Sequence, residues 1–364
     1  MDKIKKLKVT VSVLLLLTLF AGMLTGCITP LPEEPSEIPP ATSEEPLSIE
    51  LPNEKLNLLT GEYDLKKSEY GKRPIAVMVN NIKIAWPQAG IGNADLLYEM
   101  EVEGGITRLL AVFSSLERIP DKLGSVRSMR PYYINLAGGH NAIYVGHGWS
   151  GRAKDLLANQ KLIDFINGDV HGKAFFRDAA KGKQKGREHS SYTTREKLES
   201  VAKELKLNTE LEEKWQDNTF LNFRAPDNAK AVGNPCETLK VPFSKYATSV
   251  FTYDVEKKVY FKSEFSEKHI DETTGKQLAF TNVLVLFMPV SMEDSKHLAF
   301  DFSASGPGFY ASNGKIQEIK WGKGWNVEEP FKFRGADGKG MTANAGRTMV
   351  CIVRTTQEDK LSYE

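Results

Sequence analysis

The residues best suited to chemistry lie in two short segments of the first half of the chain. The first segment, residues 93–108, carries Glu99, Glu101 and Glu103 at alternate positions, and on a strand such residues project from one face. Three carboxylates on one face could perform acid–base chemistry or bind a cation. A strand with its apolar residues inward and its glutamates in solvent explains the same pattern and is the simpler expectation.

The second segment, residues 124–133, has arginines three positions apart among serines and tyrosines. The guanidinium groups of Arg127 and Arg130 could clamp a phosphate or a carboxylate, because their planar donor fork matches two acceptor oxygens. Arg108 could join them if its strand lies alongside, and Tyr132 could add a hydroxyl. Ion pairs with the glutamates of the first segment account for these arginines equally well.

Histidines add a weaker signal. His147 lies in a glycine-rich loop, Gly146-His147-Gly148-Trp149, where binding sites often form. No histidine or cysteine spacing is typical of a metal site, and no nucleotide-binding loop is present, so we expect neither metal nor cofactor. The candidate ligand-binding residues are therefore Glu99, Arg108, Arg127, Arg130, Tyr132 and His147, and no catalytic residue is assigned.

The N-terminus predicts export. A lysine-rich start is followed by the uncharged, apolar segment 9–25, which is the pattern of a signal peptide. Its end, Leu24-Thr25-Gly26-Cys27, resembles the bacterial lipobox, in which a cysteine is acylated before cleavage in front of it. A permanent signal-anchor helix is the alternative. We predict that residues 1–26 are removed and that lipidated Cys27 holds the protein by a diacylglyceryl-type anchor at the extracytoplasmic face of the cell membrane.

Residues 27–55, which begin with the lipidated cysteine, are rich in proline and glutamate. Such a segment lacks the apolar content that would offset its ordering entropy, so we expect a disordered stalk. Removal of the signal peptide takes away four lysines and Asp2, which changes the formal net charge from +1 to −2. This balance argues against a nucleic-acid partner.

The remaining chain predicts an α+β protein. Residues 56–235 mix apolar strand patterns (74–79, 96–102 and 106–113) with helical ones, and we assign them to an N-terminal α/β domain. One predicted helix, 193–205, opens with a capping-box pattern from Thr193 to Glu196.

Residues 236–364 predict a smaller, mostly antiparallel β domain. Alternating segments such as 248–255 and 258–263 flank a charged turn, and Asn313-Gly314 is typical of a tight hairpin. Cys236 and Cys351 each lie beside strand-like apolar residues, so two buried free thiols are a simpler expectation than a disulfide.

Several motifs resemble the YerB family of Gram-positive lipoproteins. They are residues 73–81, 98–108, 124–132 and 144–147 in the N-terminal part, and 282–285, 319–324 and 344–348 in the C-terminal part. The resemblance implies a lipoprotein with two domains of unknown function and supplies no reaction. The chain has Glu188-His189-Ser190 where family members carry Pro-His-Asn.

The sequence therefore predicts a lipid-anchored envelope protein that binds an anionic ligand, such as a cell-wall precursor or polymer. A hydrolase or transferase acting on these polymers, with a glutamate or histidine as general base, is one alternative. A scaffold that docks another envelope protein through its β domain is the other.

Replacing Cys27 with alanine should abolish acylation and signal-peptidase processing, because no other cysteine lies near the apolar segment. Metabolic labelling with a fatty acid, followed by isolation of the protein, measures this directly. Continued labelling of the Cys27→Ala protein would contradict the predicted anchor.

Overall fold

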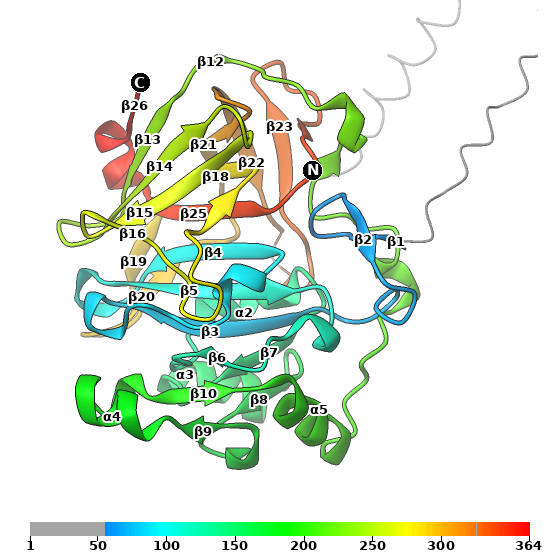
Figure 1. Ribbon diagram of the computed structural model, residues 1–364, viewed down its shortest axis with the longest axis vertical. Helices are drawn as coiled ribbons and strands as arrows, with labels where there is room; N and C mark the ends of the chain where they lie inside the picture. Colours follow the sequence, from blue (N-terminus) through cyan, green and yellow to red (C-terminus); the bar gives the residue numbers. More distant parts are fainter. Residues whose placement is uncertain (1–54, 325) are drawn as a thin grey trace, which may run out of the picture. The chain divides into compact units, whose positions relative to one another are not determined.

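An eleven-stranded mixed sheet organises the protein, which a computed structural model describes over residues 55–364 apart from residue 325 (Figure 1). The predicted signal peptide, Cys27 and the stalk up to residue 54 lie outside the described residues. In spatial order the strands are β12 (Asn234–Pro235), β22 (Lys315–Gly322), β21 (Ser305–Ser312), β18 (Asn282–Met288), β25 (Thr348–Arg354), β4 (Leu96–Glu101), β5 (Thr107–Phe113), β3 (Ile75–Asn81), β7 (Ile143–Gly146) and β8 (Phe165–Asn167), and β23 (Lys332–Gly335) pairs with β22.

The central strands of this sheet run mostly parallel. Strands β18, β25, β4, β3, β7 and β8 share one direction, whereas β5 and β21 run against them. Each of β3, β4 and β18 is buried along its whole length, in agreement with their mostly apolar sequences. The carboxyl ends of the parallel strands therefore meet at one edge of the sheet, which we call the carboxyl edge.

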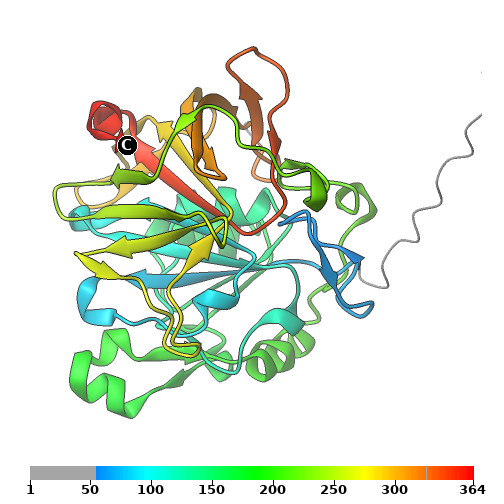
Figure 2. The same cartoon turned by 45° about the horizontal axis from the view of Figure 1, so that its top comes forward.

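A second, six-stranded sheet packs on one face of the large sheet. It contains β16 (Glu267–Lys268), β15 (Val259–Glu264), β14 (Thr248–Asp254), β13 (Thr238–Pro242) and β26 (Ser362–Tyr363), with β17 (Ala279–Phe280) paired to β15. Inward residues such as Phe251 and Tyr260 join a core with Val77 and Leu97 of the large sheet. Helices α2 (Pro131–Gly138) and α3 (Gly151–Lys154) cover the opposite face, where Tyr133 packs in a second core (Figure 2).

Shorter elements complete the molecule. They are α4 (Ala179–Lys185), α5 (Arg195–Glu204), β1 (Lys55–Leu56), β2 (Tyr63–Leu65), β6 (Leu123–Gly124), β9 (Phe176–Arg177), β10 (Ser191–Thr193), β11 (Asn222–Phe223), β19 (Val290–Met292), β20 (Leu298–Phe300) and β24 (Thr342–Ala343). None of the helices within residues 55–364 is long and apolar enough to cross a membrane.

The α+β fold predicted from the sequence is confirmed. Both predicted domain ranges, 56–235 and 236–364, contribute strands to the large sheet, because β25 pairs with β18 on one side and with β4 on the other. The boundary at residue 235 stays a prediction. Cys236 and Cys351 are buried and unpaired, as expected.

The predicted hairpin of β4 and β5 is also present. Gly104 and Gly105 form its connection with φ of 76° and 75°, a left-handed conformation that favours glycine. The expectation that its glutamates lie in solvent is wrong, because Glu99 is 0% and Glu101 6% exposed. Lys262 and Arg354, both from the C-terminal part of the chain, form ion pairs with Glu99 and Glu101.

Helix α5 begins one residue later than its capping box predicted. Thr194, and not Thr193, is the N-cap, since its side chain accepts a hydrogen bond from the Lys197 amide. The hydroxyl of Thr193 instead donates to the Ala174 carbonyl at 2.7 Å.

Substituting Thr194 with alanine should lower the free energy of unfolding by about 0.5–2 kcal/mol, because one amide of the first helical turn loses its acceptor. Urea denaturation measures the loss. The matched variant Glu196→Ala removes the carboxylate that a cap at Thr193 would require, and it should change stability little. An equal loss in both variants would contradict the cap at Thr194.

Candidate functional site

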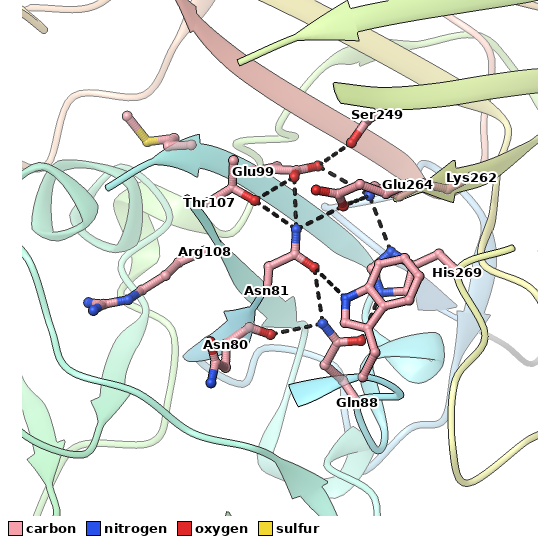
Figure 3. Close-up of polar contacts among 12 residues, drawn as sticks. Asn80, Asn81, Gln88, Glu99, Thr107, Arg108, Ser249, Lys262, Glu264 and His269 are labelled. Atoms are coloured by element: carbon pink, nitrogen blue, oxygen red, sulfur yellow. Dashed lines mark hydrogen bonds and ion pairs between the residues drawn. The ribbon is translucent and has the colours of Figure 1, made fainter. Parts of the chain in front are cut away.

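Alternating side chains at the carboxyl edge build two polar groups on opposite faces of the large sheet. Asn80 pairs with Arg108, and Asn81 with Thr107, across the antiparallel strands β3 and β5. Because side chains alternate along a strand, Asn81 and Thr107 point to the face covered by the second sheet, whereas Asn80 and Arg108 point to the helix-covered face. Figure 3 shows Arg108 directed away from the polar contacts around Asn81.

The first group, the buried ionic network, consists of Asn81, Glu99, Thr107, Ser249, Lys262 and Glu264. Its centre is the Lys262 ammonium, whose Nζ lies 2.7 Å from Oε2 of Glu264 and 3.3 Å from Oε2 of Glu99. All three charged side chains are completely buried. Glu99 comes from β4 and the other two from β15, so the network joins the two sheets.

Neutral groups complete the hydrogen bonding of Glu99. Its Oε1 accepts from Asn81 and from the Thr107 hydroxyl, and its Oε2 accepts from Ser249 at 2.8 Å. Asn81 also contacts Oε2 of Glu264 at 2.9 Å. Every oxygen of Glu99 is thus used inside the protein, and none is directed to a ligand.

His269 extends the network to Gln88. Its Nδ1 lies 3.2 Å from the Lys262 ammonium, which can only donate, so Nδ1 accepts and the proton sits on Nε2, 2.8 Å from Oε1 of Gln88. Burial and the Lys262 charge hold the pKa of His269 well below its usual range. The histidine is therefore neutral.

Two carboxylates face one ammonium in this closed environment. Burial, followed by the negative charge of Glu99, raises the pKa of Glu264 to about 7, although Lys262 opposes the shift. The Oε1 atom of Glu264 is also buried without a hydrogen-bond partner. A protonated Glu264 is accordingly favoured in the folded state under mildly acidic conditions.

The second group, the arginine cluster, consists of Arg108, Arg127 and Arg130. The segment that carries the last two lies between the carboxyl ends of β3 and β7: the Arg127 amide donates to Met78, and its carbonyl accepts from His147. Ligand sites of open α/β sheets form outside the carboxyl ends of parallel strands. The cluster thus occupies a place where binding residues are expected.

Each arginine is held differently. Arg130 makes a bidentate, side-on contact with Glu103, in which Nε lies 2.6 Å and Nη2 lies 2.9 Å from the two carboxylate oxygens. Arg108 donates to the Ser128 carbonyl, and Arg127 donates through Nη1 to the Glu188 carbonyl, each at 2.6 Å. Among the described residues, no carboxylate lies within ion-pair distance of Arg108 or Arg127.

The pKa shifts of the three arginines reflect the difference between their partners. Burial, and then the positive charge of Arg130, lowers the pKa of Arg108 to about 10, and burial also lowers the pKa of Arg127. Burial likewise opposes the charge of Arg130, but its hydrogen bonds to Glu103 raise its pKa overall. Arginine stays charged in proteins, so the cluster is a partly buried region of excess positive charge.

The structure brings together only some of the residues that the sequence suggested. Arg108, Arg127 and Arg130 lie together, whereas Glu99 belongs to the buried ionic network. Tyr132 is 2% exposed and donates to a backbone carbonyl at 3.3 Å, so it packs beneath the cluster. His147 adjoins Arg127 by its backbone, but its ring contacts the Ser191 hydroxyl at 2.6 Å.

Sequence reasoning missed Lys262 and Glu264 of the buried ionic network, and it missed Asn80, which neighbours the arginine cluster. The Nδ2 atom of Asn80 contacts Nδ1 of His189. Burial, and then the positive charge of Arg127, lowers the pKa of His189. Lys262 and Glu264 follow Tyr260 at alternate, inward positions of β15. That pattern of an inward aromatic followed by two inward charges was visible in the sequence and could have indicated buried ion pairing.

A possible cation site lies elsewhere. The ligand atoms of Glu293, Asp294 and His297 all come within 4.8 Å of one another between β19 and β20. Both carboxylates are exposed, and such acidic groups are common on protein surfaces without an ion.

Stability should fall as pH rises through the titration range of Glu264. Its folded-state pKa, about 7, exceeds its ordinary value of 4.5, so the folded protein binds more protons between these values and loses stability toward pH 7. Between pH 5 and pH 8 the free energy of unfolding of the wild type should fall by about 1–3 kcal/mol more than that of Glu264→Gln. Urea unfolding at both pH values measures this, with exposed Glu267→Gln as control. Parallel pH profiles for the wild type and Glu264→Gln would contradict the assignment.

Comparison with known proteins places the chain in a family. The N-terminal domain of a protein of unknown function (DUF3048) matches residues 59–208, and the corresponding C-terminal domain matches residues 239–350. The Bacillus subtilis (strain 168) protein named "Putative lipoprotein YerB" is 32% identical over 294 residues, which cover 78% of this chain and 81% of the relative. The crystal structure of the Bacillus subtilis YerB protein superposes with a TM-score of 0.73 and 28% identity, covering 85% of this chain and 99% of that one. The chain, which matches both DUF3048 domains, therefore belongs to the YerB family.

Proposed function

We propose that this protein is a lipid-anchored protein of the cell envelope that binds an anionic ligand through its arginine cluster. The lipobox at residues 24–27 and the lipoprotein name of the Bacillus subtilis relative support the anchor. The excess of guanidinium groups at the carboxyl edge of the sheet supports the binding role.

The observation that carries the binding role is the unused edge of Arg127. Its Nη1 donates to the Glu188 carbonyl, but its Nε is buried and has no partner among the described residues. Nε and Nη2 form the same side-on edge by which the neighbouring Arg130 holds Glu103. Buried donors are nearly always paired, so this edge fits an acceptor group that comes from outside the chain.

The chemistry of the cluster selects the ligand class. A side-on guanidinium edge matches two oxygens of a carboxylate or phosphate, and Arg108 supplies a second positive charge without a carboxylate partner. An envelope polymer or precursor that carries phosphodiester or carboxylate groups meets both requirements. The ligand would enter a partly buried site, where an ionic hydrogen bond is worth more than at the surface.

Replacing Arg127 with lysine should weaken ligand binding by about tenfold to a hundredfold, because lysine keeps the charge but cannot reproduce the side-on pair. Titration calorimetry with inorganic phosphate, a soluble polyol-phosphate polymer and a carboxylate-bearing peptidoglycan fragment measures the affinity.

Arg118→Lys is the matched control, since Arg118 is a half-buried arginine whose partners are Asp64 and Asp95. It should change the melting temperature and leave the affinity unchanged. The proposal fails if the wild type binds none of the three probes, or if Arg127→Lys lowers only the melting temperature.

A further inference from the structure

A groove of about 380 Å3 lies over β22 and β23, near the end of the large sheet opposite β8 (Figure 1). A volume of this size is typical of small-molecule sites. Gly322 of β22 and Ser305 of β21, which pair directly, line it and leave space because their side chains are absent or small. Its charged lining residues are four basic ones, Lys320, Lys323, Lys332 and Arg334, and one carboxylate, Glu329. We call it the basic groove.

Strand alternation turns three of these basic side chains to one exposed face. On β22, Lys320 is exposed, whereas the next residue, Trp321, is buried. On β23, Phe333 is buried between exposed Lys332 and Arg334. The aromatic residues thus hold both strands against the core, and the opposite face of the strands presents cations.

Two of these cations are direct cross-strand neighbours. Lys320 pairs with Arg334 of β23, and on its other side it faces Pro307 of β21. Like charges in directly opposite positions of a sheet are destabilising. Glu318 faces the same way as Lys320 but does not line the groove. In the described part of the chain, no carboxylate lies within ion-pair distance of Lys320, Lys332 or Arg334. The repulsion therefore fits an anion that comes from outside the chain.

Lys323 adds a buried cation directly after β22. Only 6% of this residue is exposed, and its Nζ donates to the carbonyls of Asn326 and Val327 at 3.0 and 3.3 Å. Burial lowers its pKa to about 8, although the negative charge of Glu329 opposes the shift. An ammonium has three donors, so one remains for a further acceptor. Buried charges are usually paired, so a buried cation held by neutral carbonyls is a second indication that the groove takes an anion.

We infer that the basic groove binds an extended chain of phosphate groups. Directly opposite residues of a sheet lie about 5 Å apart, and alternate residues of one strand lie about 7 Å apart. Lys320, Lys332 and Arg334 therefore form a ladder of charges that matches repeated negative groups. Three of the four cations are lysines, whose ammonium groups bind phosphate as point charges and do not select the planar fork of a carboxylate. Inorganic polyphosphate and a polyol-phosphate polymer share this chemistry.

The basic groove is separate from the arginine cluster, so a ligand in one does not depend on the other. Strand β22 is separated from β5, which carries Arg108, by β21, β18, β25 and β4. At about 4.8 Å per strand, β22 and β5 lie roughly 24 Å apart. Arg108 points to the helix-covered face of the sheet, whereas Lys320 points away from Trp321, which belongs to the core on that face.

The test follows the fluorescence anisotropy of a labelled inorganic polyphosphate titrated with the full chain in a non-ionic detergent. We expect saturable binding that weakens as the salt concentration rises. The double variant Lys320→Gln/Arg334→Gln should bind about threefold to twentyfold more weakly. Lys315→Gln, on the same strand but outside the groove, is the matched control and should bind like the wild type. The inference is overturned if the wild type shows no saturable binding, or if the double variant binds as tightly as Lys315→Gln.

Two further kinds of variant separate binding from folding. A Cβ at Gly322 would meet only the Cβ of Ser305, at 3.7 Å, which is an ordinary van der Waals contact. Gly322→Val should therefore fold, occupy the groove without changing its charge, and weaken polyphosphate binding several-fold. Lys320→Gln and Arg334→Gln should each keep or raise the melting temperature of the free protein, because each relieves the repulsion between them. Unchanged affinity in Gly322→Val places the ligand outside the groove and contradicts the inference.

Competing polymers test the ligand class. Unlabelled polyphosphate and poly(glycerol phosphate) should both displace the probe, and the tighter of the two identifies the source of the phosphates. Polyglutamate of equal charge should compete several-fold less well, and equal competition contradicts the phosphate class.

The two anion sites are distinguished in an Arg127→Lys background. There the double variant Lys320→Gln/Arg334→Gln should lose the same factor in affinity for the labelled polyphosphate as it does with Arg127 intact. A loss that appears only when Arg127 is intact would overturn a separate site in the basic groove and leave the arginine cluster as the anion site.

Discussion

The interaction on which the structure most depends is the ionic contact of Lys262 with Glu99 and Glu264 between the two sheets. Removing two carboxylates and an ammonium from water is costly, and their mutual attraction offsets that cost only when the geometry is precise and the remaining polar atoms are bonded. Asn81, Thr107 and Ser249 supply those additional bonds to Glu99. An apolar contact would tolerate sliding of one sheet on the other, whereas this network accepts one register.

This fixed register determines how the arginine cluster is held. Asn81 and Thr107 belong to the network, and their immediate neighbours Asn80 and Arg108 project from the other face of the same strands. The segment that bears Arg127 is hydrogen-bonded to β3 at Met78. A rigid polar core on one face of the sheet therefore orients a charged group on the other, as a binding site requires of its supporting residues.

Sequence reasoning reached the features that local patterns encode. The hairpin of β4 and β5 followed from two apolar runs around Gly104-Gly105, and the grouping of Arg127 and Arg130 followed from their spacing. The position of β25 beside β4 could not be predicted from the sequence, because that pairing joins residues about 250 positions apart and leaves no local pattern. The burial of Glu99 was missed for the same reason, since its partner Lys262 lies on another sheet.

The insertion of β25 between β18 and β4 also bears on how the chain is made. Strand β4 is synthesised early, yet its neighbour on one side ends at Arg354, ten residues before the C-terminus. The N-terminal part cannot complete its sheet until residues 348–354 are available, and such distant pairings form slowly. Under the export proposed above, this delay would be an advantage, because a sheet that closes late would leave the chain unfolded during translocation.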